Sequence, residues 1–166
     1  MKFEIDVSGY DMFKDTYVIC IASEDGKIIK GFKFNKELID KLVANWKSNK
    51  YRYEYNDYET KRGIFKVRIY SIILYYIFKS IEKQDWISLT ICRDFKGRTN
   101  EITQNLRYFL EVILKIKMGK PLYQGLSNIS HAHIYANMMR RDTKNLLKTY
   151  VNISLEDIEK FLEKRN

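Results

Sequence analysis

Three β-type segments in close succession at the start of the chain constrain its fold most strongly. Residues 3–8 alternate apolar and polar side chains, which is typical of a strand with one buried face. Residues 17–22 form a continuous apolar run rich in β-formers, which indicates an interior strand. Asp25-Gly26 separates this run from a third one at 28–34, and Asp-Gly between two such runs is a strong hairpin signal. The sequence therefore predicts that the chain opens with a three-stranded antiparallel meander.

Helical and strand-like patterns alternate in the rest of the chain. Apolar residues at helical spacing predict a first helix over 38–46, with Asn35 as a possible N-cap. The further expected elements, in order, are a long helix over 61–83, a strand over 87–92, a helix from Thr99 or Asn100, a weak fifth strand over 122–130, a helix over 131–150 and a last helix from Ser154. This order predicts an α/β fold in which a mixed five-stranded sheet carries helices on both faces. We expect residues 1–166 to form a single domain.

Composition limits the class of protein further. Of the 166 residues, 45% are apolar and 14% aromatic, which is enough for a real core and argues against disorder. The most apolar run covers only residues 69–78, whereas a membrane-spanning helix needs roughly 20 residues. No signal peptide is visible at the N-terminus, and Cys20 and Cys92 both lie in apolar runs. We therefore expect buried, reduced thiols in a cytoplasmic protein.

A positive charge balance points to a polyanionic partner. The chain has 30 Lys and Arg against 21 Asp and Glu, a formal net charge of +9. Nucleic acid is the simplest such partner, although surface charge for solubility is the alternative. Cations and tyrosines gather in three stretches, which nominate these residues for nucleic-acid binding: Lys50, Arg52, Tyr53, Lys61, Arg62, Arg93, Lys96, Arg98, Arg140 and Arg141. For the tyrosine-rich stretch, a partly buried aromatic cluster is the alternative interpretation.

Two aspartates lie at positions from which their carboxylates could bind one cation together. Asp6 lies inside the first predicted strand, and Asp94 follows the fourth. If these strands are parallel neighbours, their carboxyl ends meet at the ligand crevice of an α/β sheet and the two acids approach each other. Two carboxylates held together suit a hard cation such as Mg²⁺, which takes one or two carboxylates plus substrate phosphate. A hydrogen bond within the strand for Asp6 and a turn for Asp94 are the alternatives.

A third aspartate lies in the predicted helix over 131–150. Asp142 falls on an otherwise apolar stripe with Ile134, Met138 and Leu146, where a carboxylate is costly unless it is paired or bound to metal. It is either a further metal ligand or the partner of a neighbouring arginine or lysine.

At this point the chain resembles the ribonuclease H-like superfamily, and within it small archaeal proteins described as RNase H-like nucleases. The segments Asp6-Val7-Ser8-Gly9 and Cys92-Arg93-Asp94 look like the first-strand and fourth-strand aspartates of that superfamily. The histidines His131 and His133, ahead of Asp142, are similar to the histidine that family ribonucleases often carry before the last acid.

The resemblance implies a three-layer fold and a site in which Asp6, Asp94 and Asp142 hold one or two Mg²⁺ or Mn²⁺ ions. It also implies that His131 or His133 assists proton transfer or product release. The chain departs from the family pattern because residues 60–81 contain no acid. Glu59, at the entrance of the long helix, is the best substitute for the missing ligand.

These observations lead to three functional hypotheses. The first is a metal-dependent nuclease that hydrolyses phosphodiester bonds of DNA or RNA by an RNase H-like carboxylate mechanism. The second, motivated by the missing helix acid, is a catalytically inactive nucleic-acid-binding or adaptor protein with the same fold. The third is a protein-interaction module whose basicity is incidental.

Overall fold

A computed structural model describes residues 1–56 and 58–164, without the side chains of residues 59 and 60. The strands are β1 (Lys2–Ser8), β2 (Val18–Ser23), β3 (Ile29–Lys33), β4 (Trp86–Ile91), β5 (Lys117–Met118) and β6 (Leu122–Tyr123). The helices are α1 (Lys36–Lys47), α2 (Glu59–Ser80), α3 (Thr99–Leu106), α4 (His131–Arg141) and α5 (Leu155–Glu159), and α3 continues as a π-helix, η1, over Arg107–Ile113.

The strands form one mixed, open sheet. Their order is β3-β2-β1-β4-β5, and β6 also pairs with β4. The opening meander is confirmed, because β1 pairs antiparallel with β2 and β2 with β3. The structure also meets the condition set for the approach of the two aspartates, because β1 pairs parallel with β4, with Ile5 opposite Ile91. The carboxyl ends of these two strands therefore lie side by side, which is the arrangement that the two aspartates require.

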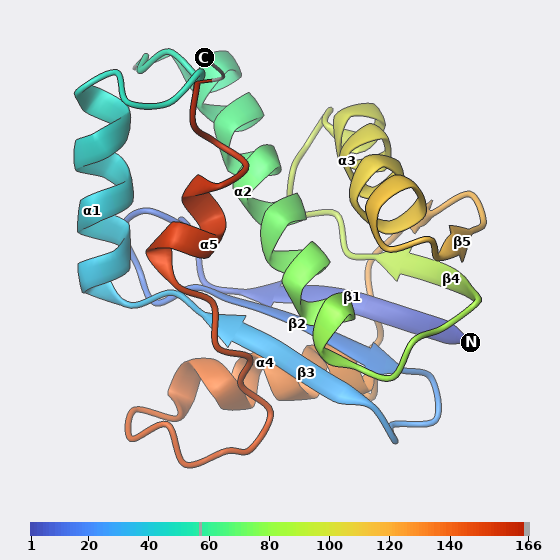
Figure 1. The fold of residues 1–166 in the computed structure, drawn as a ribbon. Coiled ribbons are helices and arrows are strands. Elements are labelled where there is room, and N and C mark those ends of the chain that lie inside the picture. The colour runs from blue at the N-terminus through green and yellow to red at the C-terminus, as the bar shows by residue number, and fades with distance from the viewer. Residues whose placement is uncertain (57, 165–166) are drawn as a thin grey trace.

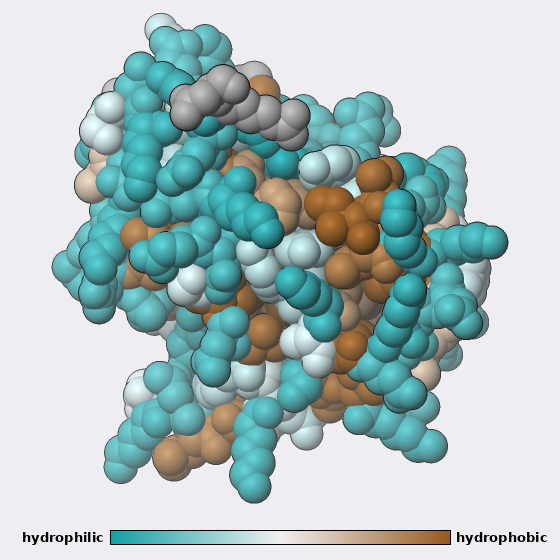
Figure 2. All heavy atoms as spheres, in the orientation of Figure 1, coloured by the Kyte–Doolittle hydropathy of each residue, from teal (hydrophilic) through white to brown (hydrophobic). Residues whose placement is uncertain are grey.

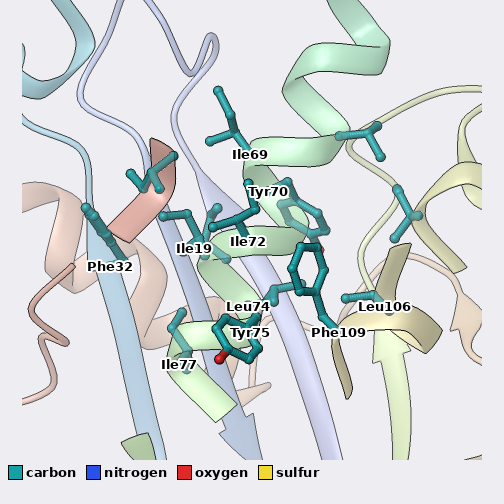
Figure 3. Close-up of a cluster of buried hydrophobic side chains, with 14 of the residues drawn as sticks. Ile19, Phe32, Ile69, Tyr70, Ile72, Leu74, Tyr75, Ile77, Leu106 and Phe109 are labelled. Carbon is teal, nitrogen blue, oxygen red and sulfur yellow. The ribbon is translucent and has the colours of Figure 1, made fainter. Parts of the chain in front are cut away.

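Helices cover both faces of this sheet. In Figure 1, α4 lies on one face, while α1, α2, α3 and α5 lie on the other. The main core forms on the α2 side, where Ile19 and Phe32 of the sheet meet α2 side chains such as Ile72 (Figure 3). Figure 3 also shows Phe109 reaching this cluster from η1. The α/β prediction with helices on both faces is confirmed, and the sheet has one strand more than expected.

Helix α2 is the central packing element and is apolar almost all round in its second half. Its residues Ile69, Ile72, Ile73 and Ile77 are fully buried. Hydrophilic side chains cover most of the face seen in Figure 2, and hydrophobic atoms show through in patches between them, as is usual for folded proteins. In the part of the chain that the structure describes, no helix has the length and apolar character needed to cross a membrane.

Two elements near the C-terminus are shorter than predicted. The expected strand over 122–130 is reduced to the two residues of β6. The expected helix over 131–150 ends at Arg141, because the Asp142 carboxylate accepts hydrogen bonds from the amides of Leu146 and Leu147 and so stabilises a loop instead of a further helical turn. The loop then returns to the edge of the sheet, where Gly31 and Tyr150 form an isolated bridge.

A candidate metal centre beside a basic pocket

Three ligand-type side chains converge where β1 and β4 end. A carboxylate oxygen of Asp6, the Cys92 sulfur and a carboxylate oxygen of Asp94 all lie within 4.8 Å of one another. The amide of Cys92 donates to the carbonyl of Ile5 at 3.0 Å, which extends the parallel ladder one residue beyond β4. This extension fixes the Cys92 and Asp94 side chains beside Asp6. The predicted approach of Asp6 and Asp94 is therefore present in the structure.

Asp6 is buried, and both of its carboxylate oxygens have partners. The residue is only 4% exposed and faces α4. Its Oδ1 accepts from the amide of Val7 at 2.9 Å, and its Oδ2 lies 2.8 Å from Nδ1 of His133. A buried carboxylate of this kind is held in one orientation, which is what a metal ligand needs.

A chain of polar side chains extends from His133 along the same face of β1. Asn137 Nδ2 lies 3.3 Å from His133 Nε2, and Ser8 Oγ donates to Asn137 Oδ1 at 2.8 Å. One hydrogen-bond direction satisfies every member: the Asn137 amide donates to Nε2, and a neutral His133 donates from Nδ1 to Asp6. Both ring nitrogens of His133 are then engaged. The structure therefore makes His133 a positioning residue for Asp6.

The two aspartates repel each other at this distance. The pKa of Asp94 is raised to about 6, because its carboxyl group is largely removed from bulk water and lies near the negative charge of Asp6. Burial, followed by the charges of Asp94 and Asp6, raises the pKa of the Cys92 thiol to about 11. A divalent cation between the carboxylates would offset this repulsion. The two carboxylates fit Mg²⁺ or Mn²⁺, which prefer oxygen ligands, while the softer sulfur of Cys92 suits other metals better.

Asp94 also lines a cavity of about 870 Å³, which we call the basic pocket. Its wall carries five cations, namely Arg62, Lys66, Arg93, Lys96 and Arg98, against two acids, Asp11 and Asp94. Lys66 is paired with Asp11 at 3.0 Å, and Arg98 with Glu101 at 2.8 Å. The Nε atom of Arg62 is buried without a hydrogen-bond partner among the described residues. The cations of the pocket thus outnumber its acids, which favours an anionic ligand.

Two glycines allow the chain to come close around this pocket. Gly9 follows β1 with a φ of +123°, and a Cβ there would lie 2.5 Å from the carbonyl oxygen of Thr16. Gly63 lies on α2, and a Cβ there would lie 2.8 Å from the Arg98 guanidinium. The absence of a side chain at Gly63 therefore leaves the space that the Arg98 guanidinium occupies.

The structure does not bring the third predicted ligand to this centre. The Asp142 carboxylate is engaged by the amides of the following loop and by the Tyr150 hydroxyl at 2.7 Å. His133, which contacts Asp6, lies nine residues before Asp142, or about 13 Å along a helix. Arg140 and Arg141 are exposed at the same distant end of α4. Asp142 therefore stabilises the loop that follows α4, which corrects its interpretation as a metal ligand.

Other predicted site residues lie elsewhere. His131 packs against Gly26, where a Cβ would come within 2.7 Å of its ring, and it lines a separate cavity with Glu4. Lys50 pairs with Glu159 and Lys61 with Glu54. Arg52 and Tyr53 line a second, smaller pocket. The side chain of Glu59, the substitute ligand, lies outside the described residues.

Replacing Asp142 by asparagine tests this correction. We expect the Tm at neutral pH to fall, because an amide cannot accept all three hydrogen bonds. Hydrogen bonds from the backbone of Leu147 and Leu146 lower the pKa of Asp142 from its ordinary 3.8. A carboxyl group whose pKa is lower in the folded than in the unfolded protein stabilises the fold at any pH above its unfolded-state pKa. This stabilisation is lost as the pH falls through its folded-state pKa. The difference in Tm between wild type and Asp142→Asn should therefore narrow below about pH 4. An unchanged Tm at neutral pH would contradict the proposed role of Asp142 in the loop.

Three important residues escape prediction from the sequence. The sequence indicates a buried core thiol at Cys92, but this residue is partly exposed and belongs to the carboxylate group. Its position on the polar face of β4, after Ser88 and Thr90, is the available signal. Lys66 and Asn137 carry no local signal, because their roles depend on partners far away in the sequence, Asp11 and Ser8.

Comparison of the chain with known protein families, with curated proteins and with solved structures found no match.

Proposed function

We propose that this protein is a metal-dependent nuclease with an RNase H-like three-layer fold, acting on the phosphodiester bonds of DNA or RNA. The observation that carries the proposal is the Asp6–Asp94 pair, of which Asp94 lines the basic pocket. Carboxylates attract a divalent cation, and the surrounding arginines and lysines attract phosphate. A phosphodiester with its metal ion satisfies both requirements at once.

Each residue has a definable role in this proposal. Asp6 and Asp94 would hold Mg²⁺ or Mn²⁺, and such an ion supplies Lewis-acid stabilisation of charge at the reacting phosphoryl group. His133 and Asn137 keep the Asp6 carboxylate oriented through their hydrogen bonds. Arg62 and Lys96 line the basic pocket, where their charge would bind phosphates of the strand without replacing the cation.

A second candidate function is a nucleic-acid-binding or adaptor protein without catalysis. It is favoured by the position of Asp142, which leaves only two carboxylates in the candidate centre among the described residues. Incubation of end-labelled single-stranded and duplex DNA and RNA with Mg²⁺ or Mn²⁺ separates the two candidates. The nuclease proposal expects cleavage that EDTA abolishes. Salt-dependent binding without cleavage of any substrate would favour the second candidate.

Arg62 provides a test of the basic pocket as the phosphate site. We expect Arg62→Gln to weaken nucleic-acid binding and to reduce the slope of log K against log salt by about one, because one phosphate contact is lost. The exposed Arg140→Gln is the matched control, since Arg140 lines none of the described cavities. Fluorescence anisotropy across a salt series measures both variants. Equal slopes for the two variants would place the phosphates elsewhere.

A further inference from the structure

A second pocket, of about 450 Å³, combines cations with aromatic rings and contains no acid. It is lined by Arg52, Tyr53, Arg68 and Tyr108, and we call it the tyrosine pocket. The Arg52 guanidinium lies 5.6 Å from the centre of the Tyr53 ring, and the Arg68 guanidinium lies 5.6 Å from that of Tyr108. These contacts hold planar groups at the pocket wall. Its lining therefore offers flat stacking surfaces together with positive charge.

Hydrogen bonds fix the two arginines independently of any ligand. Arg68 donates to the side chain of Asn105 at 2.9 Å, and Arg52 donates to the carbonyl oxygen of Phe161 at 3.0 Å. Tyr108 remains 37% exposed despite its neighbours. A pocket built in this way is preorganised, because little ordering of side chains is needed on binding.

One stripe of helical residues connects the tyrosine pocket to the basic pocket. Glu101 holds Arg98 of the basic pocket, Asn105 holds Arg68 of the tyrosine pocket, and Tyr108 lines the latter. The side chains of Glu101, Asn105 and Tyr108 follow one another along α3 and η1 over about 10 Å. That length corresponds to about three nucleotides of a stacked strand at roughly 3.4 Å each.

We propose that the nucleic acid is single-stranded along this path and that its unpaired bases stack in the tyrosine pocket while its backbone enters the basic pocket. This inference rests on the proposed nucleic-acid function and specifies its substrate. Bases of a duplex stack on each other and show only their edges in the grooves, so they cannot use ring faces of the protein. Unpaired bases stack on tyrosine rings and on arginine guanidinium planes, largely without sequence preference.

Binding measured in EDTA tests the inference without any contribution from cleavage. The probe is a fluorescein-labelled oligothymidylate of roughly twelve nucleotides, compared with its duplex with oligoadenylate. We expect the single strand to bind more tightly than the duplex. Tyr108→Ala should weaken single-strand binding about 5- to 150-fold, the range that loss of one stacked base produces. Tyr108→Phe should bind within about twofold of wild type, because it keeps the ring face.

Matched variants separate stacking from an effect on folding. Tyr58 is 75% exposed and lines neither pocket, so Tyr58→Ala should bind like wild type. If Tyr108→Ala is unfolded by circular dichroism, Arg52→Gln serves in its place, because Arg52 is exposed and its loss removes one cation of the same pocket. Duplex binding as tight as single-strand binding, or a Tyr108→Ala affinity equal to that of Tyr58→Ala, would overturn the inference.

The same measurements distinguish failure of this inference from failure of the proposed nuclease. Tight single-strand binding that depends on Tyr108, without metal-dependent cleavage, would overturn the nuclease and support the strand path. Metal-dependent cleavage with duplex preferred over single strand would support the nuclease and overturn the strand path.

Discussion

Replacing Asp94 by asparagine should lower the rate of metal-dependent cleavage by more than about 100-fold. Loss of an outer partner of a metal ligand already costs 10- to 100-fold in affinity or activity, and the loss of a ligand should cost more. The Asp94→Asn substitution keeps the shape of the side chain but removes the charge that, with Asp6, attracts the cation. The rate is measured with end-labelled oligonucleotides at saturating Mg²⁺ or Mn²⁺.

Asp142→Asn is the matched control for this experiment, because it makes the same chemical change at a carboxylate outside the centre. Asp6→Asn should behave like Asp94→Asn, with nucleic-acid binding in EDTA retained by both. Cleavage at the wild-type rate by both Asp6→Asn and Asp94→Asn would exclude the proposed centre. An equal loss in the Asp142 variant would show that the effect is general and not specific to the metal site.

Replacing Phe65 by alanine should lower the free energy of unfolding by about 3–5 kcal/mol, the usual cost of truncating a fully buried phenylalanine. Phe65 is fully buried in the first half of α2. Its ring stacks on Trp46 with centroids 4.3 Å apart and also contacts the rings of Tyr51 and Tyr53. The cavity left by the truncation would loosen the attachment of the loop around residue 53 to α2. Urea denaturation followed by fluorescence measures the change.

Ile64→Ala is the control for Phe65, because the neighbouring Ile64 is 42% exposed on the same helical turn. We expect it to change the free energy of unfolding by less than about 1 kcal/mol. The Phe65 variant should also bind nucleic acid more weakly, since Arg62 and Lys66 flank the truncated side chain on α2. A Phe65→Ala protein as stable as Ile64→Ala would mean that the aromatic cluster does not hold the start of α2.

The part of the fold that the sequence predicts well depends on local patterns. The alternation in 3–8 and the Asp25-Gly26 turn are readable because a strand face and a hairpin are properties of neighbouring residues. The approach of Asp6 and Asp94 is also predictable, because parallel strands align their carboxyl ends. For this pair, strand order is the only long-range assumption required.

The rest of the site depends on partners that no local pattern reveals. The apolar stripe through Asp142 fits a continuing helix, but hydrogen bonds to the amides of Leu146 and Leu147 favour a loop at that point. The tyrosine pocket joins Arg52 and Tyr53 to Arg68 and Tyr108, which are separated by long stretches of chain. The packing of α2 against α3 and η1 brings Arg68 and Tyr108 together. Contacts of the preceding loop with Phe65 and with the C-terminal segment place Arg52 and Tyr53 beside them.

The hydrogen-bonded chain from Ser8 through Asn137 and His133 to Asp6 restricts where residues can be inserted or deleted. Two positions along β1, Asp6 and Ser8, are matched to residues one helical turn apart on α4, His133 and Asn137. One residue inserted between the two α4 positions would turn Asn137 by about 100° away from the strand. The surface loop over 143–150 has no such matching to the centre. Natural or engineered changes of chain length within that loop therefore leave the centre intact. Changes of length within this single turn of α4 disrupt it.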